Sequence, residues 1–478
     1  MSAARTPRPS RGLALLTLAA ALACASPPPP VWKRPPPPVP DAPVVPEGAL
    51  HRSELPNGVR VLVLEDHRLP RVSIGVTLRR GSASESLSEA GVALFMAELM
   101  EHGAGRRDAL ALANAVDQLG ADLSVGSGWD STTAGISGLS RDLDALLGIL
   151  GDVVLRPRFE RSEAKRVRDE ALAGIEQSKD DPATLASWNA AAAIYPGHRY
   201  GLPREGTRAS VARLDADAAR KLHRRFFVPN DAILWASGDL DPAAFAARAQ
   251  EIFGAWSAGP VAELGPPPPD PTPGERLIVV VDRPDLQQVR IILCHEGIAR
   301  SNPQRVGASL MSDLLGGGGF SSRLMESLRA ESGLTYSVGS GFSMRRWKGP
   351  FSVSTFTRVA EVRRVLDLAL SVIERFRVEP PGEAELVPAR TLAIGEFSLG
   401  LETSNAVTAG LVDLDVYGLP EDSLDTYRSR VRATTPAEMA ELAQQLLHPE
   451  RMAIVLVGPA EKLVPQLDGL GPVEVLKP

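Results

Sequence analysis

The sequence predicts an α+β protein built from two tandem α/β domains, each a largely antiparallel sheet with helices packed on it. At 478 residues the chain exceeds one compact domain and fits two of roughly 200 residues. The same order of strands and helices occurs twice, on either side of a proline-rich break. A content of 44% hydrophobic and 23% charged residues is typical of a globular protein.

The repeated order of elements predicts a duplicated α/β unit. Both halves begin with β-rich sequence, continue with a helix, and close on a strand followed by a glycine turn. In the first half these segments are 59–64, 72–78, 90–102 and 232–237. In the second half they are 277–281, 289–293, 305–315 and 452–457.

The N-terminus has the features of an export signal. Three arginines precede a short apolar run at 13–23, and small residues stand at both positions that a signal peptidase reads, directly before Cys24. We therefore expect residues 1–23 to be a signal peptide and Cys24 to carry a lipid. That places the protein in the periplasm, tethered to a membrane as a lipoprotein. Simple secretion and an unprocessed leader remain the alternatives.

Two proline-rich stretches divide the remainder. Residues 24–48 are expected to form a semi-extended tether that holds the protein off a membrane surface. Residues 259–275 contain a Gly-Pro-Pro-Pro-Pro run that cannot form a helix or a central strand, and are expected to be a linker. The predicted domains are therefore 49–258 and 276–478.

Charge and cysteine content exclude several classes of function. The net charge of −6 gives no basic footprint for nucleic acid. The chain has 2 cysteines, Cys24 and Cys294, so lipidation of the first leaves no intramolecular disulfide. Cys294 lies in an apolar, strand-like run and is expected to be a small core residue.

Several short strings occur along the chain in an order that resembles the pitrilysin/insulinase family of zinc peptidases, over essentially all of residues 50–470. They are Leu55-Pro56-Asn57-Gly58, Tyr195-Pro196-Gly197-His198, Pro229-Asn230, the glycine-rich segment Leu315 to Leu324, and Leu328 to Ser337. The resemblance implies the two-domain fold and, in active members, a zinc ion. That ion is held by a His-x-x-Glu-His motif and a distant Glu.

The resemblance also implies that the zinc motif is replaced here. Two His at i and i+4 on one helix face share the ion, and the Glu between them activates water. Aligned on the flanking glycines, the His positions hold Leu94 and Glu98 and the Glu position holds Ala97. The third ligand position falls at Ala173 or Gly174. We predict that this chain binds no metal and that zinc is held by a partner subunit.

A rival register shifts the motif by about one helical turn. Glu98 and His102 then lie at i and i+4, with Glu101 as base and Glu176 as third ligand. This reading implies a metallopeptidase with an unusual site. Against it, Gly103 follows directly where the family continues the helix. The simpler interpretation places His102 in the last helical turn, beside the negative end of the helix dipole.

A second part of the family's site is retained. Active members use an Arg and a Tyr, seven residues apart in the second domain, to hold the substrate carbonyl and stabilise the oxyanion. Arg329 and Tyr336 match that spacing. Arg supplies a permanent charge and the Tyr hydroxyl a neutral donor. The alternative is a surface Arg paired with Glu331 or Glu326, and a half-buried strand Tyr.

The glycine-rich segment is a candidate substrate-binding loop. Gly316, Gly317, Gly318 and Gly319 expose backbone donors and allow close approach of an extended peptide. It lacks the Lys-Ser/Thr of a phosphate loop. The alternative is a flexible turn between two helices.

The resemblance therefore implies the non-zinc-binding subunit of a heterodimeric peptidase. Its partner carries an intact His-x-x-Glu-His motif, its substrates are unfolded peptides, and it is inactive alone. A non-catalytic peptide-binding or scaffold protein of the same fold is the second hypothesis.

Overall fold

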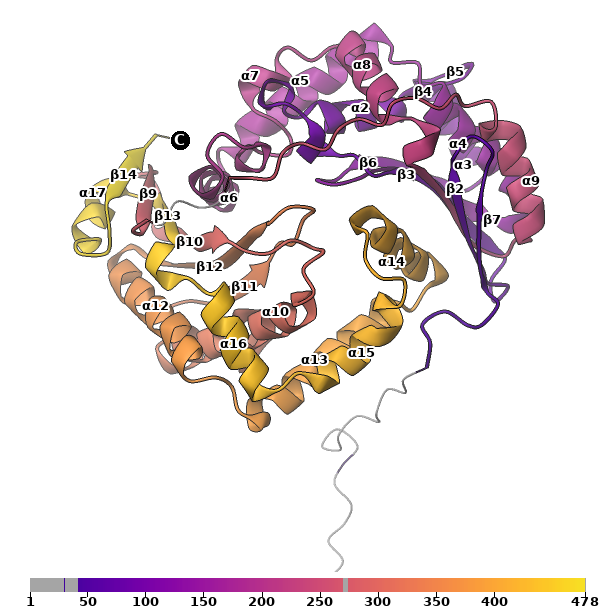
Figure 1. The fold of residues 1–478 in the computed structure, drawn as a ribbon. Coiled ribbons are helices and arrows are strands. Elements are labelled where there is room, and N and C mark those ends of the chain that lie inside the picture. The colour runs from indigo at the N-terminus through magenta and orange to yellow at the C-terminus, as the bar shows by residue number, and fades with distance from the viewer. Residues whose placement is uncertain (1–29, 31–41, 270–273, 478) are drawn as a thin grey trace, which may run out of the picture. The chain divides into compact units, whose positions relative to one another are not determined.

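The computed structural model describes residue 30 and residues 42–269 and 274–477 (Figure 1). The predicted signal peptide, the lipidation site Cys24 and most of the tether lie outside the described residues. No helix in the described ranges is both long and apolar enough to span a bilayer.

The first half of the chain forms a six-stranded sheet in the order β1-β2-β8-β3-β7-β6. Its only parallel pair among the described strands is β2 with β8. The strands are β1 (Leu50–Glu54), β2 (Arg60–Glu65), β3 (Arg71–Leu78), β6 (Asp122–Ser127), β7 (Thr132–Leu139) and β8 (Ala232–Gly238). A two-stranded ribbon joins β4 (Gly103–Ala104) to β5 (Arg107–Asp108).

The second half forms another six-stranded sheet, in the order β11-β12-β10-β13-β9-β14. The strands are β9 (Leu277–Asp282), β10 (Gln288–Glu296), β11 (Val338–Phe342), β12 (Pro350–Arg358), β13 (Ala453–Gly458) and β14 (Val473–Leu476). Strand β9 pairs in parallel with both β13 and β14, and the other pairs are antiparallel.

The two sheets have the same topology in five of their strands. Strands β2, β8, β3, β7 and β6 correspond in order and direction to β9, β13, β10, β12 and β11. Only the sixth strand differs, because β1 precedes β2 and is antiparallel to it, whereas β14 ends the chain and is parallel to β9. The structure thus confirms the predicted fold class of two repeated, largely antiparallel α/β units.

Helices follow the strands in the same order in both halves. In the first half they are α2 (Val92–Met100), α3 (Ala109–Gln118), α4 (Leu143–Leu155), α5 (Arg161–Ser178), α6 (Pro182–Ile194), α7 (Arg208–Val211), α8 (Ala216–Phe226) and α9 (Pro242–Phe253). In the second half they are α10 (Arg305–Ser312), α11 (Arg323–Met325), α12 (Val362–Val378), α13 (Glu383–Leu399), α14 (Ser404–Tyr417), α15 (Ser423–Ala433), α16 (Pro436–Leu446) and α17 (Ala460–Leu463).

One helix from each half packs on the sheet of the other half. Leu185 and Ala186 of α6 share a buried cluster with Val279 of β9. Leu411 of α14 likewise packs against Leu62 of β2. Each central strand is therefore covered on both faces, which explains why β2, β9 and β13 are apolar runs instead of alternating strands.

The loop after β11 adds polar contacts between the halves. The guanidinium of Arg345 lies over the rings of Trp129 and Tyr200, 4.2 and 4.5 Å from their centroids. The Tyr417 hydroxyl of α14 donates a hydrogen bond of 3.0 Å to Asp130, which is buried in the first half. The chain from Asp41 to Pro478 accordingly forms one compact unit.

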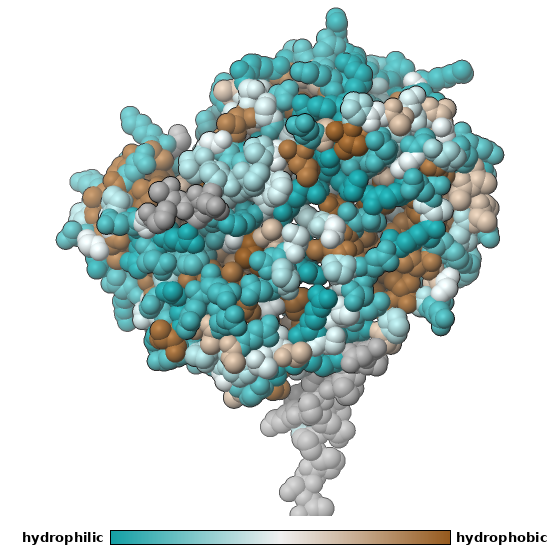
Figure 2. All heavy atoms as spheres, in the orientation of Figure 1, coloured by the Kyte–Doolittle hydropathy of each residue, from teal (hydrophilic) through white to brown (hydrophobic). Residues whose placement is uncertain are grey.

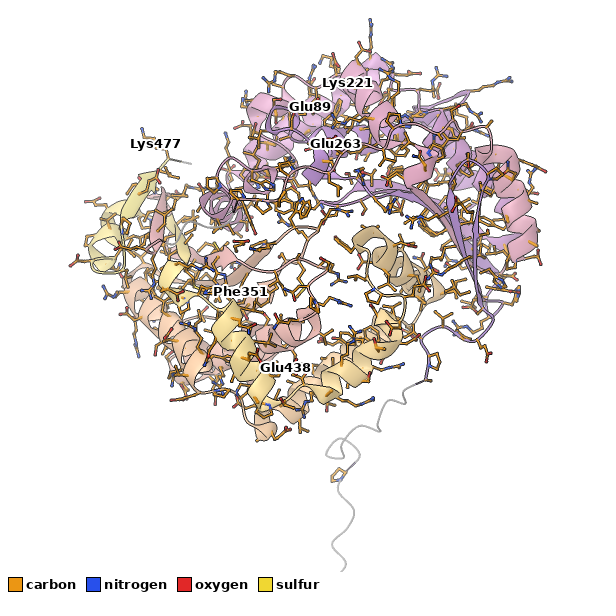
Figure 3. The ribbon with its side chains drawn as sticks, in the orientation of Figure 1. Glu89, Lys221, Glu263, Phe351, Glu438 and Lys477 are labelled. Carbon is orange, nitrogen blue, oxygen red and sulfur yellow. The ribbon has the colours of Figure 1, made fainter. Side chains whose placement is uncertain are left out.

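Polar side chains cover the face seen in Figure 2, with hydrophobic residues gathered in smaller areas between them. Lys221 and Glu89 lie on the first half's surface, with Nζ and Oε1 3.7 Å apart (Figure 3). Phe351 of β12 is fully buried, and its ring centroid lies 4.7 Å from that of Phe342. Cys294 of β10 is also buried, and burial raises the pKa of its thiol to about 12.

Candidate functional site

Helix α2 carries the replaced zinc motif, and a buried carboxylate fixes its start. Gly91 precedes the helix with φ of 95°, a conformation that glycine adopts without strain. The Glu85 carboxylate accepts hydrogen bonds from the N–H groups of Gly91 (3.0 Å) and Ala93 (2.6 Å), and pairs with Arg199 at 2.7 Å. Burial raises the pKa of Glu85, and Arg199 opposes that shift. The helix is thus held at one defined position against the sheet.

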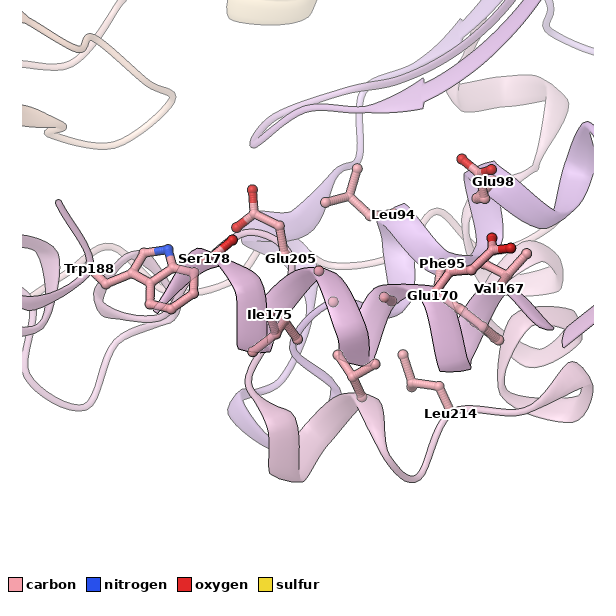
Figure 4. A pocket seen from close by; sticks show the side chains of 14 residues that line it. Leu94, Phe95, Glu98, Val167, Glu170, Ile175, Ser178, Trp188, Glu205 and Leu214 are labelled. Carbon is pink, nitrogen blue, oxygen red and sulfur yellow. The ribbon is translucent and has the colours of Figure 1, made fainter. Parts of the chain in front are cut away.

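Three of the positions aligned with zinc ligands line one pocket. Leu94 and Glu98 of α2 and Gly174 of α5 border a cavity of about 380 Å³ (Figure 4). Ala97, at the position of the catalytic Glu, is 1% exposed and packs in the core instead. Leu94 and Gly174 have no side-chain donor atom for a metal. The residues present therefore do not fit a zinc ion, although the fold brings their positions together.

The rival Glu98/His102 register is assembled only in part. His102 Nε2 lies 3.3 Å from Glu98 Oε1, and this contact lowers the pKa of Glu98. The proposed base Glu101 accepts a hydrogen bond from the Val125 N–H of β6. The proposed third ligand Glu176 is bound to other partners, Arg208 (2.6 Å) and Lys179 (3.1 Å). Within residues 42–269 and 274–477, no group of three His, Cys, Asp or Glu is arranged to hold a metal.

Arg329 and Tyr336 lie together in the second half. The guanidinium of Arg329 is 4.7 Å from the centroid of the Tyr336 ring and 4.5 Å from that of Phe320. Both rings are well exposed, Tyr336 by 72% and Phe320 by 74%. Cation–π attraction holds the guanidinium near both rings, and no hydrogen bond or ion pair with a described residue engages its N–H groups.

The alternative for these two residues was a surface Arg paired with Glu326 or Glu331 and a half-buried Tyr in a strand, and the structure shows a different arrangement. In the described part of the chain, no ion pair joins Arg329 to Glu326 or Glu331, and no hydrogen bond engages the Tyr336 hydroxyl. Tyr336 precedes β11 and does not lie in a strand. Both side chains therefore keep donors available to a ligand.

Three of the four glycines, Gly316 to Gly318, are closely packed at the end of α10, and the fourth, Gly319, has a positive φ. The helix continues into a π-helical turn, Asp313–Gly317. An added Cβ at Gly316 would lie 2.9 Å from the Ser340 N atom, and one at Gly318 would lie 2.8 Å from the Asp313 carbonyl oxygen. Gly319 has φ of +70° with open space around it. Structural need thus accounts for these glycines, and the loop places the Phe320 ring beside Arg329 at the same time.

The two candidate sites lie in different halves of the chain. The pocket around Leu94 is lined by first-half residues, and neither Arg329 nor Tyr336 borders it. Sequence reasoning missed Phe320, Trp188 and Glu205. Phe320 carries a signal, since a large apolar residue directly follows the run of four glycines. Trp188 and Glu205 come from separate segments and only the fold brings them to the pocket.

Two family models match the sequence. Residues 60–208 match the model described as "Insulinase (Peptidase family M16)", and residues 213–392 match the one described as "Peptidase M16 inactive domain". Together with the fold, these matches define an M16-type peptidase fold. The chain belongs to peptidase family M16, which confirms the resemblance to the insulinase family.

Known relatives agree with this assignment. An uncharacterized zinc protease of Streptomyces coelicolor is 24% identical, over 86% of this chain and 90% of the relative. One from Mycobacterium leprae is 27% identical, over 87% of this chain and 93% of the relative. A crystal structure described as the peptidase M16 inactive domain from Pseudomonas fluorescens superimposes with a TM-score of 0.80 and 27% identity. The match covers 86% of this chain and 98% of that structure. A Helicobacter pylori protease, 18% identical, has the same fold, with a TM-score of 0.77 and coverage of 86% and 99%.

Proposed function

We propose that this chain is the non-zinc-binding subunit of an M16 peptidase. In this proposal Arg329 and Tyr336 act on the substrate, and a second family subunit with an intact His-x-x-Glu-His motif supplies zinc and activates water. Unfolded peptides are the substrates. We also propose that the protein is exported to the periplasm and anchored through Cys24.

The observation that carries the proposal is the contrast between the two sites. The positions of the zinc ligands hold Leu94, Glu98 and Gly174, and of these residues Glu98 alone has a side chain that could bind a metal. The Arg329 guanidinium and the Tyr336 hydroxyl instead have free donors next to solvent. Division of the catalytic groups between two subunits accounts for the loss of one set and the retention of the other.

The two retained side chains suit oxyanion stabilisation. A tetrahedral intermediate of peptide hydrolysis places negative charge on the former carbonyl oxygen, and fixed donors aimed at that oxygen lower the barrier. The Arg329 guanidinium contacts both the Phe320 and the Tyr336 rings, and these contacts limit the rotamer freedom that is lost on binding. The glycine-rich loop contributes Phe320, one of the two rings that contact Arg329.

The proposal is tested by reconstitution. The partner is sought as the product of an adjacent gene that encodes His-x-x-Glu-His, and the two proteins are purified alone and together. We expect cleavage of unfolded peptides by the mixture and by neither protein alone. Removal of one oxyanion donor costs about 10²–10³ in kcat, so Arg329→Ala and Tyr336→Phe should each lower kcat by that order.

Arg364→Ala on α12, which removes an exposed arginine 65% accessible at its side chain, is the matched control and should leave kcat unchanged. Full activity of both Arg329→Ala and Tyr336→Phe would refute the assignment. Peptide binding by a stable homodimer, with no cleavage when the partner is present, would instead establish the scaffold function.

A further inference from the structure

The pocket beside α2 has no part in the proposed chemistry of Arg329 and Tyr336, yet it is large. Its volume of about 380 Å³ falls within the range of about 300–1,000 Å³ that is usual for ligand sites. Its walls come from α2, α5, α6 and the segment around α7, and they are mainly apolar. The large apolar side chains in the lining are Leu94, Phe95, Val167, Ile175, Trp188, Val211 and Leu214.

All the charged residues of this lining are acidic. They are Glu98, Glu170 and Glu205, and the lining includes no Lys, Arg or His. Glu170 accepts two hydrogen bonds of 2.8 Å from Arg166, and Glu98 contacts His102. The Glu205 carboxylate has no hydrogen bond or ion pair with any residue that the structure describes. One carboxylate at the pocket is therefore available to an external cation.

The acidic groups lie at the two ends of an apolar surface. In Figure 4, Glu205 lies near Trp188 at one end, and Glu98 and Glu170 lie at the other, with Leu94 between them. Such a surface suits a side chain that has an aliphatic stem and a charged tip, because the stem packs on apolar walls while the tip meets a carboxylate. The indole of Trp188 adds an aromatic face, which attracts cations.

We propose that this pocket binds the side chain of a lysine or arginine residue of an extended peptide. The cationic tip pairs with Glu205, and the stem lies along the wall formed by Leu94 and Ile175. Since a peptide ligand is part of the proposed function, the pocket supplies a preference for basic residues in the substrate. In this chain the place that corresponds to the metal site has become a site for a substrate side chain.

Gly174 keeps this space open. An added Cβ at Gly174 would meet no atom within 4 Å, so a larger residue is accommodated there without a backbone clash. A leucine at this position of α5 would project its side chain into the pocket and occupy the volume that the ligand needs. Gly174→Leu is therefore a clean test of the pocket, because helical leucine is also favoured over helical glycine.

The test measures peptide binding to the isolated chain by fluorescence anisotropy at low ionic strength. Three short peptides, uncharged elsewhere, differ at one residue, which is arginine, citrulline or norleucine. Citrulline has the shape of arginine without its charge. We expect the arginine peptide to bind about tenfold more tightly than the other two, as for a charge-assisted hydrogen bond. Glu205→Gln should reduce that preference to about twofold or less.

Gly174→Leu should abolish the preference, whereas Gly148→Leu, at an equally open glycine of α4, should leave it intact. Equal affinity for the arginine and citrulline peptides, an undiminished preference in Gly174→Leu, or no binding of any peptide would each overturn the proposal. Arg329→Ala should not alter the preference. A protein that keeps this preference but fails to activate a partner would separate the pocket from the proposed function.

Discussion

His295 shows how burial controls the chemistry of a single side chain in this fold. It lies at the end of β10 and is 3% exposed. Its Nδ1–H donates to the carbonyl oxygen of Glu296 at 2.6 Å, and its Nε2 accepts from the backbone N–H of His448 at 3.2 Å. Burial lowers the pKa of His295 to about 4, because a proton on Nε2 would create a desolvated charge. It would also remove the acceptor for His448.

This environment predicts acid-sensitive stability. The folded pKa of about 4 lies below the ordinary value of 6.5. Between these values the unfolded chain binds the proton more readily, so the stabilisation is complete above pH 6.5 and is lost as pH falls toward 4. One pKa unit equals about 1.4 kcal/mol, so the full loss is about 3 kcal/mol. Urea unfolding at pH 7 and pH 4 should show His295→Gln losing less stability than the natural protein. Equal losses would contradict the assignment.

Single residues of the site were predictable where a spaced motif carries them. Arg329 and Tyr336 are seven residues apart in the sequence, and the structure places the guanidinium 4.7 Å from the centroid of the ring. The replaced ligand positions Leu94 and Glu98 were predictable for the same reason. Glu205 and Trp188 were not, because their place at the pocket depends on how α5, α6 and α7 pack around α2.

At the scale of elements, the glycine-rich loop packs closely against its neighbours and also places Phe320 beside Arg329. The predicted helix 305–315 is α10 (Arg305–Ser312) continued by the π-helical turn Asp313–Gly317. The sequence pattern does not distinguish the two, and it also does not show that Gly316 and Gly317 lie close to Ser340 of β11. Such turns widen a helix by one residue and are frequent at functional sites.

The loop predicts opposite outcomes for two neighbouring glycines. Alanine at Gly318 would force its Cβ within 2.8 Å of the Asp313 carbonyl oxygen, a backbone atom that cannot move alone. We expect Gly318→Ala to shift the loop with Phe320 and to lower partner-dependent kcat about tenfold or more. Gly319→Ala meets no atom within 4 Å, and its positive φ costs about 1–2 kcal/mol.

Gly319→Ala should therefore lower the free energy of unfolding by about that amount and leave most of the activity. Kinetics of the reconstituted pair and urea unfolding of each variant measure the two effects. A Gly318→Ala protein with unchanged kcat would show that the position of the loop does not matter for catalysis.

At the scale of the molecule, the repeated unit was predictable and the exchange of helices was not. The proline-rich break and the two series of elements indicate a duplication. The amino-acid sequences of α6 and α14 do not indicate that each of these helices packs on the sheet of the other half. The apolar runs of β2, β9 and β13 indicate burial on both faces, but they do not identify the covering helix.

This exchange predicts that the two halves unfold together. Leu411 belongs to the second half of the chain, yet it is 3% exposed and packs against Leu62 and Leu64 of the first sheet. Leu411→Ala should lower the free energy of unfolding by about 2–4 kcal/mol. Because neither sheet keeps both faces covered without the other half, native-state hydrogen exchange should report this loss equally for amides in β2 and β10.

The matched substitution Leu399→Ala, in α13 and 73% exposed, should change stability by less than about 0.5 kcal/mol. A loss of protection confined to one sheet in Leu411→Ala would mean that the halves open independently. In that case the exchanged helices would be surface contacts. Equal losses of protection in both sheets would instead show that α6 and α14 belong to one shared core. The packing that stabilises the fold would then also fix the position of Arg329 and Tyr336 relative to the pocket beside α2.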